Sequence, residues 1–235
     1  MENQDLAPYC VRRATRRPGL EGKWDGPAWA HADTLTVRHF HPNSSDHRPL
    51  VQVRMVYDSE GVYGIFRVED QYVLCTHTEY LGHVYEDACV EFFVHPKPDR
   101  GYFNFEMNCG GALLLFYIED PTRLNDPARP DEEFVRSTPV PKPLGSRVRI
   151  GHSLPRVVAP EIETPVVWTL EFHIPFSLFE TFVGPLGDAA GQEWRANFNK
   201  CADACSHPHW GTWAPLGEEL NFHQPHRFGP IRFCP

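Results

Sequence analysis

Much of the fold is decided by the segment Asp87–Gly111, which reads DACVEFFVHPKPDRGYFNFEMNCGG. It predicts two β-strands joined by a turn rich in proline, aspartate and glycine. In the second strand Phe103, Phe105 and Met107 share one face, because side chains alternate along a strand with a period of two. The opposite face carries Tyr102, Asn104, Glu106 and Asn108. Amides, carboxylates and phenols form paired hydrogen bonds with hydroxyls, so this face favours either a polyol-binding surface or a solvated sheet face.

Alternation of apolar and polar side chains recurs along the chain and predicts an all-β fold. The 23 prolines and 17 glycines interrupt the chain at strand-like intervals, a pattern typical of a sandwich or barrel. We expect one β-sandwich of two mainly antiparallel sheets. The expected strands are Leu35–Phe40, Pro49–Asp58, Val62–Asp70, Ala88–His95, Tyr102–Asn108, Ala112–Ile118, Arg147–His152, Val166–Ile174, Trp194–Lys200 and Phe228–Phe233.

Two segments depart from the strand pattern. Pro175–Phe182, PFSLFETF, predicts a short helix, because proline is favoured in the first helical turn. Residues 119–143 are rich in proline and charge and predict a long loop. This loop is no linker, because neither side of it completes a sandwich alone, and the chain has no repeats. We therefore expect an N-terminal extension over residues 1–20 and a single domain over residues 21–235.

Composition narrows the classes of partner. A hydrophobic content of 41% is sufficient for a sizeable core. The formal net charge of −9 argues against nucleic acid and anionic membranes, which both require a basic face. No apolar run approaches the ~20 residues that span a bilayer. The start, MENQDLAPYCVRRATRRPG, lacks the apolar segment of a secretion signal, so we expect a cytoplasmic protein unless a leader has been removed.

Five segments carry a family resemblance. They are Leu20–Trp29 (LEGKWDGPAW), Val68–Val73 (VEDQYV), Val84–Pro96 (VYEDACVEFFVHP), Tyr102–Gly111 (YFNFEMNCGG) and Asn221–Phe233 (NFHQPHRFGPIRF). In this order they resemble the family 9 carbohydrate-binding modules, and more closely the family 9-like branch of stand-alone bacterial proteins. The resemblance covers nearly the whole chain. It implies an immunoglobulin-like or jelly-roll β-sandwich that binds saccharides without catalysis, in polysaccharide recognition or catabolism.

The resemblance also implies a ligand held between two aromatic rings. Tyr80 is the nearest match to the first ring, which is a tryptophan in the sugar-binding modules. Glu86 matches a carboxylate that accepts hydrogen bonds from sugar hydroxyls, and Asn104 stands where the family has a hydrogen-bonding side chain, often arginine. The second ring belongs to the loop HPHWGTWAP, where Trp210 and Trp213 both qualify. These departures mean that the family's ligand preference is not transferred to this chain.

The residues themselves support a saccharide site. Sugars combine an apolar C–H face with a hydroxyl rim, so their sites pair a flat aromatic ring with a few directional polar groups. A second strand with an amide-rich face, WRANFNKC, places Arg195, Asn197 and Asn199 on one side. We expect Tyr80 and one loop tryptophan to face each other over a cleft with a polar floor. The candidate ligand-binding residues are Tyr80, Glu86, Asn104, Glu106, Asn108, Arg195, Asn197, Trp210 and Trp213.

The other four tryptophans are expected in the core. Trp168 alternates with Leu170 and Phe172, a pattern typical of a strand face that packs inward. The remaining three are Trp24, Trp29 and Trp194.

Cysteine and histidine residues suggest a metal site as an alternative interpretation of residues 201–209. Cys201, Cys205, His207 and His209 are four soft ligands within nine residues, but zinc sites usually draw their ligands from two separate elements. The seven cysteines are an odd number, so at least one is unpaired or pairs between chains. No cofactor is required for saccharide binding; structural calcium is the one cofactor that the resemblance admits.

Other classes of function are less favoured by the sequence. A glycosidase needs two carboxylates across one bond, and Glu91 and Glu106 lie on strands that are expected to be neighbours. No nucleophile elbow, phosphate loop or zinc-protease motif occurs. Haem ligation through Met55 or Met107 is a third class, but both alternate with apolar neighbours and predict core packing.

Overall fold

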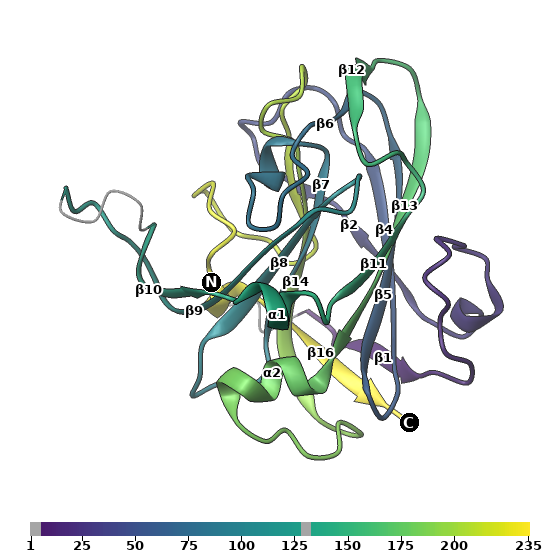
Figure 1. Cartoon of the computed structure of the whole chain (residues 1–235), viewed down its shortest axis with the longest axis vertical. Helices are drawn as coiled ribbons and strands as arrows, with labels where there is room; N and C mark the ends of the chain where they lie inside the picture. Colours follow the sequence, from purple (N-terminus) through teal and green to yellow (C-terminus); the bar gives the residue numbers. More distant parts are fainter. Residues whose placement is uncertain (1–5, 128–132) are drawn as a thin grey trace.

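The computed structural model describes residues 6–127 and 133–235. Its strands form two facing layers (Figure 1). The first layer contains, in spatial order, β10 (Phe134–Pro139), β9 (Leu113–Arg123), β8 (Tyr102–Asn108), β7 (Cys89–His95), β14 (Glu193–Cys201) and β16 (Gly229–Cys234). The second contains β1 (Tyr9–Arg13), β4 (Leu50–Tyr57), β5 (Gly61–Asp70), β13 (Val166–Pro175) and β11 (Arg149–His152), with β2 (Thr34–Val37) beside β4.

The pairing is antiparallel except at β1, which runs parallel to both β16 and β4. These parallel pairs carry the hydrogen-bond path from one layer into the other. Smaller pairings join β12 (Val158–Ile162) to β6 (Val73–Cys75), and β15 (Trp210–Thr212) to β14 and β3 (His39–Phe40). The predicted sandwich of mainly antiparallel sheets is confirmed.

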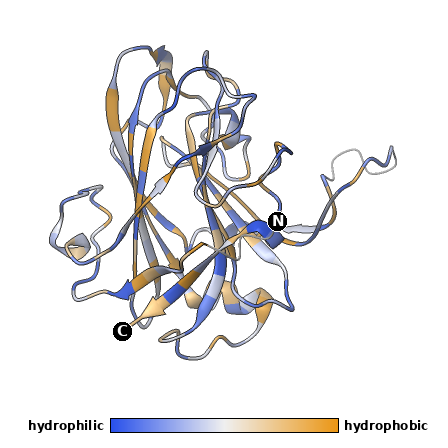
Figure 2. Ribbon diagram, turned by 180° about the vertical axis from the view of Figure 1, so that it is seen from behind, coloured by the Kyte–Doolittle hydropathy of each residue, from blue (hydrophilic) through white to orange (hydrophobic). Residues whose placement is uncertain are grey.

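The main core lies between the layers. Alternation along β7 turns Val90, Phe92 and Val94 inward, and the ring of Phe92 packs against rings from both layers. Its centroid lies 5.7 Å from that of Phe172 on β13 and 5.2 Å from that of Phe198 on β14. The ribbon shows the same alternation as mixed hydrophobic and hydrophilic segments along single strands (Figure 2).

The four tryptophans predicted for the core differ in their surroundings. Trp168 and Trp194 are buried in the main core, as predicted. Trp29 is buried in a separate cluster on the outer face of the second layer, with Val56, Tyr63 and Ile65. Trp24 is only half-buried, and the guanidinium of Arg54 lies 4.1 Å from its ring centroid.

Two segments depart from the sequence prediction. Residues 119–143, expected as a loop, contain the end of β9, the whole of β10 and the start of the short helix α1 (Lys142–Gly145). The pairing of β10 with β9 is irregular, with two register shifts, so no clean alternation marks it in the sequence. The predicted extension over residues 1–20 contains β1, which pairs with both layers. The short helix is confirmed as α2 (Phe176–Val183), with Pro175 at its N-cap.

A disulfide joins Cys10 on β1 to Cys234 at the end of β16. The other five cysteines are unpaired and buried: Cys75, Cys89, Cys109, Cys201 and Cys205. The prediction that at least one cysteine lacks an intrachain partner is therefore confirmed. No helix of the described residues is long and apolar enough to cross a membrane.

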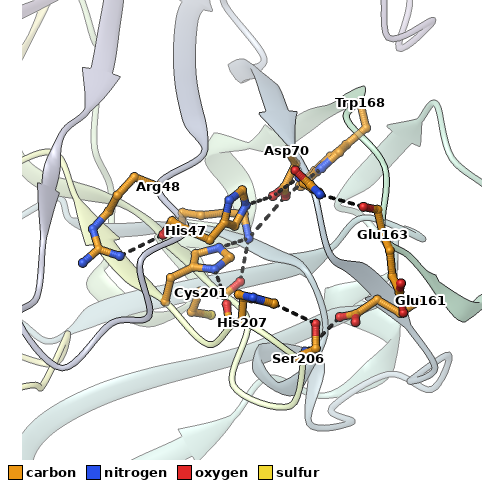
Figure 3. A network of polar contacts seen from close by, with 12 residues as sticks. His47, Arg48, Asp70, Glu161, Glu163, Trp168, Cys201, Ser206 and His207 are labelled. Atoms are coloured by element: carbon orange, nitrogen blue, oxygen red, sulfur yellow. Dashed lines mark hydrogen bonds and ion pairs between the residues drawn. The ribbon is translucent and has the colours of Figure 1, made fainter.

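A buried polar network links the layers at one end of the sandwich (Figure 3). Lys200 ends the inward row of β14, is fully buried, and its Nζ lies 3.7 Å from Asp70 Oδ2 at the end of β5. The ammonium also donates to the backbone oxygen of Cys201 and lies 2.8 Å from His209 Nε2. Asp70 is further bound by the side chains of His47 and Trp168. The charge of Lys200 is thus neutralised inside the protein.

Candidate functional site

A cleft with a volume of about 1230 Å³ lies on the outer face of the first layer. Its floor is the outward face of β7, β8 and β14, because side chains that alternate with the core residues point this way. Four segments build its walls: the loop around the 3₁₀ turn η2 (Val84–Glu86), the arm formed by β9 and β10, the region of β15, and the loop 220–223. The arm projects from the sandwich at the left of Figure 1.

The floor carries two carboxyl groups side by side. Glu91 on β7 is directly opposite Glu106 on β8 in the antiparallel register, which places their Cβ atoms about 4.5–5.5 Å apart. Glu91 accepts hydrogen bonds from Asn199 Nδ2 at 3.0 Å and from the Cys201 thiol at 3.1 Å. Glu106 Oε1 accepts one from Asn104 Nδ2 at 2.9 Å. Both carboxyls are almost completely buried.

Burial changes the ionisation of this pair. Desolvation raises the pKa of Glu91 to about 7, although the hydrogen bonds from Asn199 and Cys201 oppose the rise. Desolvation, reinforced by the neighbouring charge of Glu91, holds the pKa of Glu106 well above its usual range. Two adjacent carboxylates in a poorly hydrated site resist simultaneous ionisation. The pair therefore retains a proton at neutral pH.

Aromatic side chains form most of the walls. Trp210 lies on one wall, where its Nε1 donates to Asp203 Oδ1 at 2.8 Å. Tyr85 stands near it and stacks on His83, with ring centroids 5.4 Å apart. On another side His223 packs against Phe134, with centroids 4.6 Å apart.

The imidazole of His223 is held neutral in this wall. Burial, aided by nearby Arg123, lowers the pKa of His223 to about 3. Its Nδ1 lies 2.8 Å from the hydroxyl of Tyr102, with which it shares a hydrogen bond. The ring therefore acts as an aromatic surface and adds no positive charge to the cleft.

The structure brings three of the predicted residues together in the cleft. Asn104 and Glu106 lie on its floor, and Trp210 lies in its wall. The two loop tryptophans differ in location: Trp210 lines the cleft, whereas Trp213 is buried in the main core against Tyr9 and Phe198.

Tyr80 does not reach the cleft. It is half-buried against the main core, and its hydroxyl donates to the backbone oxygen of Val140 at 2.6 Å. Its ring covers Gly145 of α1, where any side chain would collide with it. The expected arrangement of Tyr80 facing a loop tryptophan across a cleft is thus absent from the structure.

The other four predicted residues also lie outside the lining. Glu86 Oε2 lies 2.9 Å from His77 Nε2. Asn108 binds Asp87 and the backbone of His77 and Ala112, so it holds the turn after β8. Asn197 forms two hydrogen bonds with the backbone of Ala214, which covers it. Arg195 is exposed and donates to the backbone oxygen of Phe228.

From the sequence, Glu91 is a candidate only as half of a catalytic pair with Glu106; its side of β7, shared with Cys89 and Phe93, is buried and forms the floor of the cleft. Two further cleft residues are absent from the sequence-based candidates. Tyr85 immediately precedes the segment EDACVEFF, closer to it than Tyr80. Phe134, an isolated aromatic residue in a charged segment, was a usable signal for a second wall.

The four soft ligands proposed as a zinc site do not converge. His207 stacks on Tyr72 with centroids 3.6 Å apart, and His209 binds Lys200. Within the described ranges, the one group of three potential ligands is Cys89, Glu91 and Cys201, whose ligand atoms lie within 4.8 Å of one another.

Hydrogen bonds to Glu91 from Cys201 and Asn199 hold this group together without a metal. Its thiols stay protonated, because burial raises the pKa of Cys89 to about 12 and that of Cys201 well above its usual range. Two thiols also make a poor fit to calcium, which prefers six to eight oxygen ligands. Met55 and Met107, the candidate haem ligands, are fully buried in the main core.

Comparison with known proteins places the chain in a family. The model of carbohydrate-binding family 9 matches residues 29–233. The chain belongs to this family. The match confirms the resemblance that was inferred from the five segments. No curated protein matches this family 9 member in sequence.

Solved structures with similar folds include a protein from Bacteroides uniformis to which carbohydrate binding has been attributed. It is 27% identical, with a TM-score of 0.80, over 95% of this chain and 97% of the other. A family 9 module from Caldicellulosiruptor kristjanssonii in complex with glucose has 13% identity and a TM-score of 0.60, over 95% of both chains. A complex of such a module with cellotriose gives 14% identity and a TM-score of 0.60, over 96% of this chain and 93% of the other. These two likenesses show the fold alone.

Replacing Glu106 with glutamine should stabilise this family 9 protein at pH 8. A carboxyl whose folded-state pKa is raised loses stability as pH rises above its unfolded value of about 4.3, because the folded state resists ionisation. We expect a gain of roughly 1–3 kcal/mol at pH 8, since one pKa unit corresponds to about 1.4 kcal/mol. The gain should shrink towards pH 4.5. Urea denaturation at several pH values measures it.

The matched control for this prediction is Glu218→Gln, which changes an exposed glutamate. Its effect should stay within about 0.5 kcal/mol at every pH. A loss of stability in Glu106→Gln that grows as pH rises above about 4.3 would show that the folded protein binds Glu106 as an ionised carboxylate.

Proposed function

We propose that the protein binds saccharides in this cleft and releases them unchanged. The observation that carries the proposal is the combination of aromatic walls with a floor of directional hydrogen-bonding groups. Flat rings such as Trp210 and Tyr85 offer contact area to the C–H faces of sugars at little entropic cost. Asn104 and Glu106 offer paired contacts to hydroxyls. Membership of carbohydrate-binding family 9 supports the same function.

The arrangement of the two carboxyls favours binding over hydrolysis. A glycosidase places one carboxyl group on each side of the scissile bond. Glu91 and Glu106 instead come from adjacent strands of one floor, with their side chains in register. Both carboxyl groups therefore contact a bound ligand from the same side, as expected for groups that hydrogen-bond to the ligand without cleaving it.

Truncating Trp210 should weaken saccharide binding. We expect Trp210→Ala to raise the Kd for glucose or cellotriose by about 5- to 150-fold, which corresponds to about 1–3 kcal/mol for losing one large ring contact. Isothermal titration calorimetry measures the change. The matched control is Trp24→Ala, because Trp24 is half-buried outside the cleft. Unchanged affinity in Trp210→Ala would contradict the placement of the ligand.

Hydrolysis is the second candidate, and its test is separate. The in-register carboxyl pair with raised pKa values is the one observation that favours it. Release of reducing sugar from a polysaccharide by the purified protein, lost in Glu106→Gln, would replace binding by catalysis as its function. No release is expected.

A further inference from the structure

The cleft has an excess of acidic groups. Among the described residues that line it, four carry carboxyl groups and one carries a guanidinium, Arg123, which forms an ion pair with Glu133. The remaining three are Glu91, Glu106 and Asp203. Lys200 faces the opposite side of β14 and is neutralised by Asp70. The floor therefore holds buried carboxyls without a cationic partner within the described part of the chain.

Hydrogen-bond acceptors on the floor also outnumber their donors. In the described residues, Glu106 receives one hydrogen bond, from Asn104 to Oε1. Asn199 donates to Glu91, but its own Oδ1 is buried without a partner. Among the residues that the structure describes, Trp210 is the one side chain that donates to Asp203. A ligand group that fits such a floor supplies several donors and a positive charge, and an ammonium group has three donors and no acceptor.

We propose that the cleft selects saccharides with free, protonated amino groups, such as glucosamine units whose nitrogen is unsubstituted, over neutral saccharides. The inference rests on the proposed function, since it assumes that saccharides bind in this cleft. The aromatic walls contact the C–H faces of the sugar, and the ammonium group lies over Glu91 and Glu106. N-acetylation removes both the charge and two of the donors, so acetylated units lack this contact.

Binding of an ammonium group is coupled to release of a proton. The carboxyl pair holds a proton in the free protein because burial raises both pKa values, and the charge of Glu91 adds to the rise at Glu106. A cation beside the pair favours its fully ionised form, so the proton leaves as the ligand enters. The titratable groups that surround the pair in the cleft are Tyr85, Cys89, Tyr102, Glu133, Cys201 and Asp203. Lys200 acts on the pair from the opposite face of β14, where Asp70 is its counter-ion.

The test compares three β-1,4-linked trisaccharides, made of glucosamine, N-acetylglucosamine and glucose. Each is titrated at pH 6 by calorimetry, in two buffers with different ionisation enthalpies, so that proton release is measured together with affinity. We expect the glucosamine trisaccharide to bind at least ~10-fold more tightly than the glucose trisaccharide, as for a hydrogen bond to a charged group. We also expect proton release with the glucosamine trisaccharide alone.

Two variants of the cleft and one control identify the groups responsible. Glu106→Gln should bring the ratio of the two affinities close to one and abolish proton release. Asp203→Asn, which keeps an acceptor for Trp210, should lower the ratio by a smaller factor. The control Asp33→Asn changes an exposed carboxylate paired with Arg12 and should leave the ratio unchanged. It tests whether the preference arises from the net charge of −9.

The outcomes separate the two proposals. Equal affinities for the glucosamine and glucose trisaccharides would overturn the amino-sugar inference and leave saccharide binding intact. An equal fall of the ratio in Asp33→Asn and Glu106→Gln would also overturn it, because the attraction would then be non-specific. Failure of the folded protein to bind any of the three would overturn the proposed function as well.

Discussion

Replacing Asp70 with asparagine is expected to lower the free energy of unfolding by about 3–5 kcal/mol, because it leaves the buried charge of Lys200 without its counter-ion. Burial alone would raise the pKa of Asp70, but Lys200 and the hydrogen bond from His47 outweigh it and hold that pKa well below its usual range. The carboxylate is therefore ionised in the folded protein at neutral pH. Urea denaturation at pH 7 measures the loss.

The pH dependence gives this prediction a second readout. A carboxylate with a depressed folded-state pKa contributes stability above its unfolded pKa of about 3.9, and the contribution is lost as pH falls below that value. Asp70→Asn should lack this part of the acid-induced loss.

Two further variants control the Asp70→Asn measurement. Asp33→Asn breaks an exposed ion pair and should cost less than about 1 kcal/mol. The double variant Asp70→Asn with Lys200→Met should recover part of the stability, because no unpaired charge remains. A loss in Asp70→Asn no larger than in Asp33→Asn would mean that Lys200 is not charged in the folded protein.

Replacing Phe92 with alanine is expected to cost about 3–5 kcal/mol. Phe92 is fully buried and packs against rings of both layers, so its removal leaves a cavity at the centre of the sandwich that the rigid strands cannot close. Thermal or urea unfolding measures the loss. Leu50→Ala is the control, because Leu50 is 42% exposed, and it should change stability by less than about 0.5 kcal/mol. Similar losses in the two variants would contradict the assignment of the core.

The sequence predicted the parts of the fold that depend on local pattern. The inward row of β8 follows from strict alternation, and so does the polar face with Asn104 and Glu106. The strand β10 escaped prediction because its pairing with β9 is irregular, so tertiary contacts decide its structure.

The walls of the cleft could not be predicted in the same way. They combine His83 and Tyr85, the β9–β10 arm and residues 220–223, which are far apart in the chain. Only the order of strands in the layer brings them together, and alternation does not encode that order. The side-chain orientations of Tyr80 and Tyr85 could not be predicted either, because both residues lie outside strands, where no periodicity fixes the orientation.

The Cys10–Cys234 disulfide has a mechanical consequence. A pulling force applied to the segments before Cys10 and after Cys234 passes through the sulfur–sulfur bond, and the chain between them, which spans a sequence separation of 224, stays unstretched. After reduction the force passes to β1 and β16, which are parallel and in register from Tyr9 to Arg12. Pulling the start of one strand against the end of the other shears all their hydrogen bonds at once. Atomic force spectroscopy should therefore record extension of the sandwich in the reduced protein alone.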